Sequence, residues 1–222
     1  MIIRTFPLGP LQANLYVVLF GSDAFIIDPC VPYEALGLEG VKVRGIFCTH
    51  AHFDHITEAE NIRMRTGSAL FAYETECAAI LNQHELGFGK AFSAARISPP
   101  VRALKDGEIL TPKDFGSEEQ DDILITVLHT PGHSSGSMCL LFTEKMKNGI
   151  NRYLFSGDTV FAGTVGRTDL GGNMHDMMRS VRKISDLPDD VCIFPGHGQA
   201  TTLHEEKHSN PYFTVRNDND II

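Results

Sequence analysis

Short runs of hydrophobic residues, each bounded by turn-forming residues, recur along the whole chain. Apolar runs of this length are typical of strands that are buried in a sheet. The first two, Leu15–Phe20 and Ala24–Asp28, are separated by Gly-Ser-Asp and predict a hairpin. The remaining predicted strands are Gly45–Cys48, Ile123–Leu128, Tyr153–Phe155 and Val191–Phe194.

Three segments between these strands carry apolar residues at intervals of three and four, the period of a helix that buries one face. They are Thr57–Thr66, Glu74–Leu81 and His175–Ile184, and Gly67 is placed to end the first one. Strands mixed with helices predict a layered α/β or α+β fold. The stretch Asn82–Ser98 has no clear period and is either a lid over a site or an irregular connection; its length favours a lid.

Length and charge limit the class of protein. The chain has 222 residues, and no linker rich in Gly, Ser or Pro divides it, so we expect a single domain over residues 1–222. The net charge of −9 argues against nucleic-acid binding, which needs a basic face. Anionic small substrates stay compatible with this charge, because a bound metal ion reverses the local sign.

The cysteines and the N-terminus indicate the cellular setting. Five cysteines are scattered without a C-x-x-C pair, which argues against a disulfide framework and against a thiolate zinc site. No basic and apolar leader opens the chain, and the longest apolar run, Leu15–Phe20, is far shorter than the roughly 18 residues of a membrane-spanning helix. We therefore expect a cytoplasmic protein that has no membrane partner.

Four of the predicted strands lead directly into short polar loops with metal-binding residue types. Layered α/β proteins form their sites just beyond the carboxyl ends of strands. In one-letter code the four segments are GIFCTHAH, VLHTPGH, YLFSGD and CIFPGH, and they end at His52, His133, Asp158 and His197. The Pro-Gly and Gly-Asp turns are common alone, but together the four segments predict one site built from four loops.

The densest part of this pattern is Thr49–His55, with the sequence THAHFDH. Residues two apart in an extended loop point the same way, so His50 and His52 can hold one metal ion together. Asp54 and His55 must point elsewhere, which suits a second ion close by. Four such side chains within six residues have only about a one-in-ten chance of a purely structural role.

Five histidines and two aspartates in all fit two metal ions, because His133, Asp158 and His197 arrive from the later loops. Asp158 is the natural bridge between the ions. Imidazole nitrogens and carboxylate oxygens suit Zn²⁺, and Fe²⁺ or Mn²⁺ also accept them. We expect two divalent ions as cofactors, which at a separation of about 3.5–4 Å share a hydroxide and polarise a carbonyl or phosphoryl oxygen.

This constellation resembles that of the metallo-β-lactamase-fold hydrolases over nearly the whole chain. The resemblance implies a four-layer αββα sandwich, with the site at one edge between the two sheets. It also implies three ligands for each ion and one bridging carboxylate, Asp158. The implied ligands of the first ion are His50, His52 and His133. Those of the second ion are Asp54, His55 and His197. Asp28, in Ile-Ile-Asp-Pro, matches an early aspartate of the family that steadies a ligand histidine.

Further segments resemble the glyoxalase II-like (hydroxyacylglutathione hydrolase-like) branch of this family. They are Gly163–Asp169, Phe194–Gly198, Thr201-Thr202 and Asn210–Phe213. This resemblance implies a dinuclear hydrolase of a small thioester or ester, in which a hydroxide between the ions attacks the acyl carbon. Asp54 is the implied catalytic residue, which orients the hydroxide and takes its proton. Full glyoxalase II enzymes add a C-terminal helical extension that helps to bind glutathione, and we expect none here.

Two points separate this branch from its relatives. β-Lactamases usually lack an acidic bridge at the position of Asp158, which disfavours an antibiotic hydrolase. Within Gly163–Asp169, Arg167 and Asp169 are either catalytic or, as we favour, a buried pair that orders the loop. The expected partner is a small-molecule thioester or ester, and no residue is assigned to its binding.

The main alternative is a persulfide dioxygenase, an enzyme class that shares this scaffold and a Gly-Arg-Thr-Asp segment. Such enzymes hold one iron with two His and one Asp, which here would be His50, His133 and Asp158. Their relatives lack the Pro-Gly-His-Gly pattern of residues 195–198, so His197 favours the hydrolase. A binding module with a decayed site has little support, because all seven ligand positions are filled.

Overall fold

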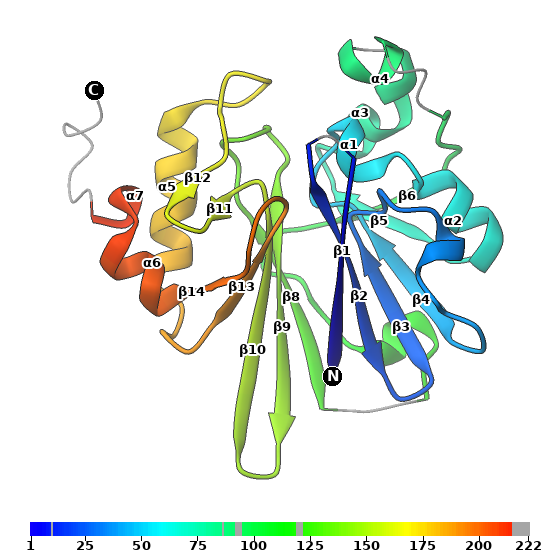
Figure 1. The fold of residues 1–222 in the computed structure, drawn as a ribbon, viewed down its shortest axis with the longest axis horizontal. Coiled ribbons are helices and arrows are strands. Elements are labelled where there is room, and N and C mark those ends of the chain that lie inside the picture. Colours follow the sequence, from blue (N-terminus) through cyan, green and yellow to red (C-terminus); the bar gives the residue numbers. More distant parts are fainter. Residues whose placement is uncertain (10, 86, 92–94, 119–121, 215–222) are drawn as a thin grey trace.

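The computed structural model describes residues 1–9, 11–85, 87–91, 95–118 and 122–214. Two six-stranded sheets lie face to face, and helices cover the outer side of each sheet (Figure 1). The first sheet is built from the N-terminal part of the chain and the second from the C-terminal part. The order of layers is therefore helix, sheet, sheet and helix, as the resemblance implied.

The strands of the first sheet are β1 (Ile2–Leu8), β2 (Ala13–Phe20), β3 (Asp23–Ile27), β4 (Lys42–Phe47), β5 (Leu70–Tyr73) and β6 (Val101–Leu104). Those of the second are β7 (Ile109–Leu110), β8 (Ile123–His129), β9 (Met138–Met146), β10 (Gly149–Gly157), β13 (Cys192–Pro195) and β14 (Thr201–Thr202). A separate short pair is β11 (Val160–Phe161) with β12 (Thr164–Val165). The first sheet runs in the order β1-β2-β3-β4-β5-β6, and the second in the order β14-β13-β10-β9-β8-β7.

The helices divide between the two outer faces. Against the first sheet lie α1 (Phe53–Ile56), α2 (Ala59–Thr66) and α3 (Cys77–Asn82), and α4 (Gly87–Ala91) projects beyond α3. Against the second lie α5 (Met174–Ser185), α6 (Leu203–Ser209) and α7 (Pro211–Thr214). The 3₁₀ turns are η1 (Tyr33–Ala35), η2 (Gln83–Glu85) and η3 (Pro112–Phe115).

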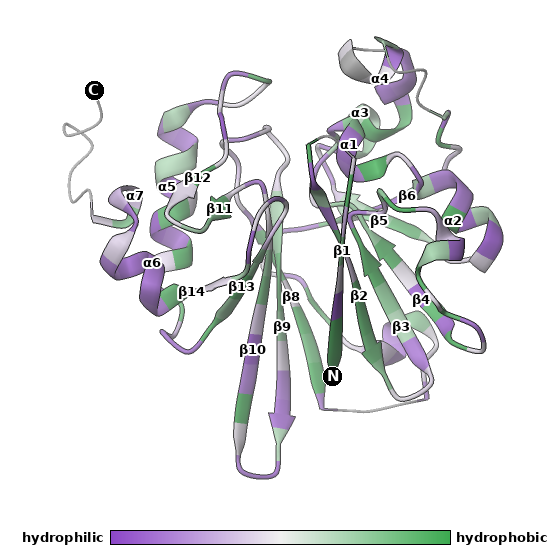
Figure 2. Cartoon of the chain, viewed as in Figure 1, coloured by the Kyte–Doolittle hydropathy of each residue, from purple (hydrophilic) through white to green (hydrophobic). Residues whose placement is uncertain are grey.

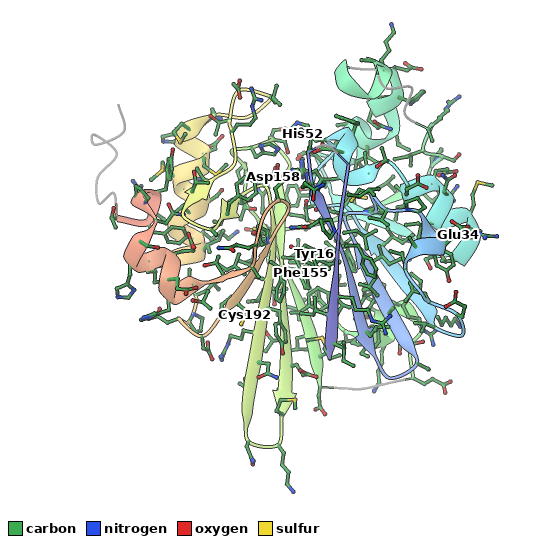
Figure 3. The ribbon with its side chains drawn as sticks, viewed as in Figure 1. Tyr16, Glu34, His52, Phe155, Asp158 and Cys192 are labelled. Atoms are coloured by element: carbon green, nitrogen blue, oxygen red, sulfur yellow. The ribbon has the colours of Figure 1, made fainter. Side chains whose placement is uncertain are left out.

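Three hydrophobic clusters hold these layers together. Alternation along β2 sends Leu15 and Val17 toward the helices and Tyr16 and Val18 into the space between the sheets. Tyr16 packs there against Phe155 of β10, with ring centroids 5.2 Å apart (Figure 3). Full burial of side chains of this size contributes about 1.5–3 kcal/mol each, so the packing between the sheets stabilises the fold together with the two clusters under the helices. In Figure 2 the strands of both sheets are largely hydrophobic, whereas hydrophilic residues mark the helices and the far end of the β9–β10 hairpin.

Helix ends follow the chemistry of their capping residues. Gly67 ends α2 with a φ of 70°, a left-handed conformation that glycine adopts without steric cost. At the start of α5, the side chain of Asn173 accepts a hydrogen bond from the backbone N–H of Asp176. The stop predicted at Gly67 and the helix predicted over His175–Ile184 are therefore confirmed.

All six predicted strands form, with ends displaced by a few residues, and the predicted hairpin joins β2 to β3. Strands β1, β5, β6, β7, β9 and β14 and the short β11–β12 pair were not predicted. The run Met138–Phe142 of β9 is buried on both faces, and such a run has no alternation that separates a strand from a helix. The helix predicted from Thr57 begins at Ala59, since Thr57 and Glu58 form the turn between α1 and α2.

The segment considered as a lid, residues 82–98, is only partly described. It contains η2 and α4, while residues 86 and 92–94 lie outside the described part of the chain. The lid stays a prediction. Among the described helices, none is long and apolar enough to cross a membrane.

Candidate metal centre

The predicted ligand residues all follow strands that end at the same edge of the sandwich. β4 leads to His50 and His52, β8 to His133, β10 to Asp158 and β13 to His197. β10 and β13 are parallel, and β8 has the same direction because both β8 and β10 are antiparallel to β9. Figure 3 shows His52 and Asp158 at this shared end, each coming from a different sheet.

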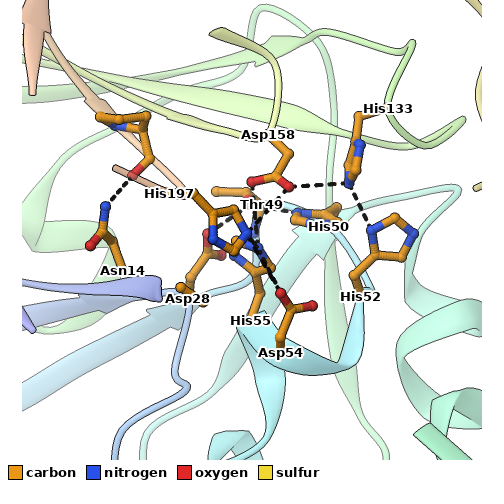
Figure 4. A network of polar contacts seen from close by, with 12 residues as sticks. Asn14, Asp28, Thr49, His50, His52, Asp54, His55, His133, Asp158 and His197 are labelled. Atoms are coloured by element: carbon orange, nitrogen blue, oxygen red, sulfur yellow. Dashed lines mark hydrogen bonds and ion pairs between the residues drawn. The ribbon is translucent and has the colours of Figure 1, made fainter. Parts of the chain in front are cut away.

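The first set of predicted ligands is closely grouped. The ligand atoms of His50, His52 and His133 lie within 4.8 Å of one another. Nδ1 of His52 faces Nε2 of His133 at 2.7 Å (Figure 4). Nε2 of His50 is buried and has no hydrogen-bond partner in the part of the chain that the structure describes. The three nitrogens therefore converge on one small volume.

The other ring nitrogens of this set are occupied by fixed partners. Nδ1 of His133 donates to the backbone carbonyl of Arg167 at 2.7 Å, and Nε2 of His52 to that of Leu170 at 3.3 Å. A carbonyl oxygen only accepts, so the facing Nδ1 of His52 and Nε2 of His133 carry lone pairs when the rings are neutral. Nδ1 of His50 lies 3.0 Å from Oγ1 of Thr49. Backbone and hydroxyl groups thus fix the orientation of each ring.

The second set has the same design. Nε2 of His55 faces Nε2 of His197 at 3.1 Å, and Oδ2 of Asp54 lies 3.5 Å from the latter nitrogen. Nδ1 of His197 donates to the carbonyl of Leu11 at 2.8 Å, and Nδ1 of His55 lies 3.1 Å from Oδ2 of Asp28. His55 is fully buried, whereas the side chain of Asp54 is 17% exposed and that of His197 24%. Within the second set, the solvent-accessible side is therefore formed by Asp54 and His197.

Asp158 lies between the two sets. Its Oδ1 is 3.4 Å from Nε2 of His55, and its Oδ2 is 3.4 Å from Nε2 of His133 and 3.6 Å from Nε2 of His197. Oδ1 is buried, and no described residue donates a hydrogen bond to it. One carboxylate therefore reaches both groups of histidines, which is the position expected of a bridge.

Asp28 is hydrogen-bonded to residues of both sets or to their immediate neighbours. Its Oδ1 accepts from the backbone N–H of Thr49 and its Oδ2 from the Thr49 hydroxyl, both at 2.8 Å. That hydroxyl has one proton, so it accepts from Nδ1 of His50 while it donates to Asp28. The carboxylate also contacts His55 directly, and one residue thereby orients a histidine of each set.

The pKa values reflect this concentration of charge. Burial and the neighbouring histidine rings lower the pKa of His50 well below its usual value. Burial also lowers the pKa of His133, against the opposing effect of Asp158. For His55, burial lowers the pKa, but the carboxylates of Asp158 and Asp28 outweigh it and raise the pKa to about 9. The lowered pKa values favour the neutral rings of His50 and His133, the form that binds a metal ion, whereas His55 must lose its proton to serve as a ligand.

Two glycines are required for this close packing. A Cβ on Gly196 would lie 2.2 Å from Oδ1 of Asp158 and 2.7 Å from Cε1 of His55. A Cβ on Gly157, whose φ is +48°, would lie 2.4 Å from Oγ1 of Thr49. The Pro-Gly-His and Gly-Asp patterns of the sequence are therefore the turns that bring the ligands together.

The residues present fit divalent cations. Facing lone pairs on imidazole nitrogens repel one another, and the buried Nε2 of His50 and Oδ1 of Asp158 have no hydrogen-bond partner among the described residues. Neutral imidazoles with carboxylates are the ligands of Zn²⁺ and of several other divalent ions.

The interpretation of Arg167 and Asp169 as a buried pair is wrong, because the two side chains are 61% and 64% exposed. The contact of Arg167 with the centre is made by its backbone carbonyl, which accepts from Nδ1 of His133.

Sequence reasoning missed two residues that hold His197 in place. Nδ2 of Asn14 donates to the carbonyls of Pro195 and Gly198, both at 3.0 Å. The hydroxyl of Tyr16 donates to the same Pro195 carbonyl at 2.5 Å. The signal for Asn14 was a polar residue at the start of an apolar run, since such a residue needs partners when it is buried.

Comparison with known proteins places this geometry in a family. The sequence profile of the metallo-β-lactamase superfamily matches residues 8–197. The hydroxyacylglutathione hydrolase GloC of Haemophilus influenzae is 29% identical, over 97% of this chain and 100% of the relative. The crystal structure of the B3 metallo-β-lactamase BLEG-1 superposes with a TM-score of 0.79 at 32% identity, over 96% of this chain and 100% of the other. That of TTHA1623 in a di-iron-bound form has a TM-score of 0.76 at 30% identity, over 94% and 99%. The chain belongs to the metallo-β-lactamase superfamily.

Proposed function

We propose that this protein is a dinuclear metal-dependent hydrolase of a small thioester or ester, with an activity like that of glyoxalase II. The observation that carries the proposal is the position of Asp158, 3.4 Å from a histidine of each ligand set. A carboxylate shared by two complete sets is typical of a two-metal hydrolytic centre. The similarity to a hydroxyacylglutathione hydrolase supports the thioester class.

Each ion has three proposed ligands besides Asp158. The first would be held by His50, His52 and His133, and the second by Asp54, His55 and His197. Zn²⁺ suits these nitrogen and oxygen donors, and Fe²⁺ and Mn²⁺ are alternatives. The di-iron form of TTHA1623 makes iron the first alternative to test. When bound, such ions would lower the pKa of a water molecule and polarise the acyl carbonyl.

Asp54 is the proposed catalytic carboxylate. It is partly exposed on the side of the centre that substrate can reach, and its Oδ2 lies 3.5 Å from Nε2 of His197. A carboxylate there can orient the attacking water and accept its proton on the oxygen that does not bind the ion. The buried rings of His50 and His55 exclude solvent from behind the reacting atoms. A thiolate leaves readily, so the reaction needs no strong general acid.

Two other activities are compatible with the scaffold. BLEG-1, which is named a B3 metallo-β-lactamase, makes β-lactam hydrolysis the second candidate, and the acidic side chain of Asp158 argues against it. A single-iron persulfide dioxygenase would use His50, His133 and Asp158 alone. It gives no role to the complete set of Asp54, His55 and His197, and is therefore less well supported.

The test is metal analysis followed by a substrate comparison. Protein purified without chelators is expected to contain about two divalent ions per chain. S-Lactoylglutathione and a simple acyl thioester are then compared with a penicillin under the same conditions. Faster turnover of the thioesters supports the proposal. About one iron per chain with persulfide-dependent oxygen uptake, or turnover of the penicillin alone, would overturn it.

A further inference from the structure

A buried carboxylate outside the ligand sets connects the two loops that carry the first set. Glu76 follows β5 and immediately precedes α3, and it is only 4% exposed. Its Oε1 accepts from the backbone N–H of Ala51 at 3.1 Å and from the hydroxyl of Ser134 at 2.6 Å. Ala51 lies between His50 and His52, and Ser134 directly follows His133. One oxygen atom thus joins the loop after β4 to the loop after β8.

The surroundings of Glu76 fix the direction of these hydrogen bonds. A carboxylate only accepts, so the single hydroxyl proton of Ser134 goes to Glu76. The Ser134 oxygen lies 2.7 Å from Oγ of Ser137, which therefore donates to it and accepts from the Ser134 backbone N–H at 3.1 Å. This series of hydrogen bonds closes the turn after His133, and its last acceptor is the carboxylate of Glu76.

Close packing leaves Glu76 little freedom to move. A Cβ on Gly136 would lie 2.6 Å from Oε2 of Glu76 and 2.6 Å from Oγ1 of Thr75. The turn of residues 134–137 is therefore pressed against the carboxylate, and glycine at 136 is what permits it. Both described donors to Glu76 are uncharged, so they do not balance its negative charge.

We propose that Glu76 is a positioning residue for the first metal ion. By holding Ala51 and Ser134 on one oxygen, it sets the separation of the His50–His52 loop from His133, and its charge favours a dication in the space that these histidines enclose. A histidine set drawn from two sheets needs such a connection, because neither loop alone determines the separation. This inference rests on the proposed metal centre but not on the identity of the substrate.

The test measures metal affinity, without substrate, in the full-length protein. Zn²⁺ is titrated in competition with a chromophoric chelator, and His52→Ala and His197→Ala define the signatures of a damaged first and second site. Glu76→Ala is expected to weaken the first site by roughly 10–100-fold, with the second site changed much less. Glu76→Gln keeps an acceptor oxygen but loses the charge, so it is expected to recover part of this loss. Gly136→Ala, which displaces the carboxylate, is expected to resemble Glu76→Ala.

Glu144→Gln is the matched control. Glu144 is an equally buried glutamate, 5% exposed, in the part of β9 remote from the site, where it accepts from Asn151. The control is expected to lower stability while both Zn²⁺ affinities stay at wild-type values. The proposal would be overturned if the first site of Glu76→Ala bound Zn²⁺ as tightly as that of the wild type. It would also be overturned if Glu76→Ala and Glu144→Gln weakened Zn²⁺ binding at both sites to the same extent. Wild-type protein that binds two ions but hydrolyses no thioester would contradict the proposed function and leave the role of Glu76 intact.

Discussion

Nδ1 of His55 lies 3.1 Å from Oδ2 of Asp28, and Asp28 has a φ of 51°, in the left-handed region that few non-glycine residues adopt. Strain of this kind costs of order 1–3 kcal/mol and persists where the surroundings enforce it. Here the hydrogen bonds from Thr49 and His55 hold the carboxylate in place. The strained backbone is therefore tied directly to the orientation of two histidine rings.

Replacement of Asp28 should weaken metal binding more than it weakens the fold. Asn tolerates the left-handed conformation, so Asp28→Asn keeps the backbone but loses part of the support of His55. We expect the affinity for the second ion to fall by roughly 10–100-fold, as is usual for residues that orient ligands. Zn²⁺ titration measures this, and urea unfolding of the metal-free variant should show a much smaller change. Unchanged affinity would contradict the assigned role.

Asp54→Ala should reduce turnover by roughly 10²–10⁴-fold, the contribution typical of a positioned proton acceptor, while the fold survives. The side chain is partly exposed and its removal leaves no closed cavity. Steady-state rates with S-lactoylglutathione and circular dichroism test the two halves of this statement. Glu58→Ala, at a nearby acid outside the ligand sets, is the control and should keep its rate.

Gly196→Ala should disrupt the centre through a single methyl group. That methyl would meet Oδ1 of Asp158 at 2.2 Å, a separation that forces the carboxylate or the loop to move. We expect the metal content to fall by about one ion per chain or more, with activity at least ~10-fold lower. Gly149→Ala is the matched control, since a Cβ there meets nothing within 4 Å. Elemental analysis measures the metal content of both variants. Equal metal content in Gly196→Ala and Gly149→Ala would contradict a role of Gly196 in the close packing of the centre.

The pairing of Glu60 with Arg63 should make stability depend on pH. Burial alone would raise the pKa of Glu60, but hydrogen bonds from the Arg63 guanidinium and from the Ser98 backbone N–H outweigh it and lower the pKa. The stabilisation is therefore complete above the unfolded pKa of about 4.3 and is lost as the pH falls through the lower folded value. Urea unfolding should find Glu60→Gln less stable than wild type at pH 7. The gap should close toward pH 3, and a gap that is constant with pH would contradict this account.

Sequence patterns predicted both the layered fold and the grouping of the seven candidate ligands at one edge. Both predictions rest on the same pattern, in which an apolar run indicates a strand and the polar loop after it carries the ligands. The supporting residues were harder to find. Asn14 acts through a hydrogen bond to a backbone atom 181 residues away in the sequence. Glu76 acts through one to a backbone atom 25 residues away. Such contacts leave no local spacing to recognise. The Arg167–Asp169 pair was correctly identified as a pair, but its burial depended on tertiary packing that local sequence does not encode.

The division of the ligands between the two sheets has a consequence for the folding of the chain. His50, His52, Asp54 and His55 follow a strand of the first sheet, whereas His133, Asp158 and His197 follow strands of the second. Each ion would therefore be a cross-link between the halves, and its binding energy would be added to the cohesion of the sandwich. A chelator should then lower the midpoint of thermal unfolding as well as the activity. Separately expressed halves should associate more tightly in the presence of Zn²⁺, so that the same ions would serve both catalysis and assembly of the fold.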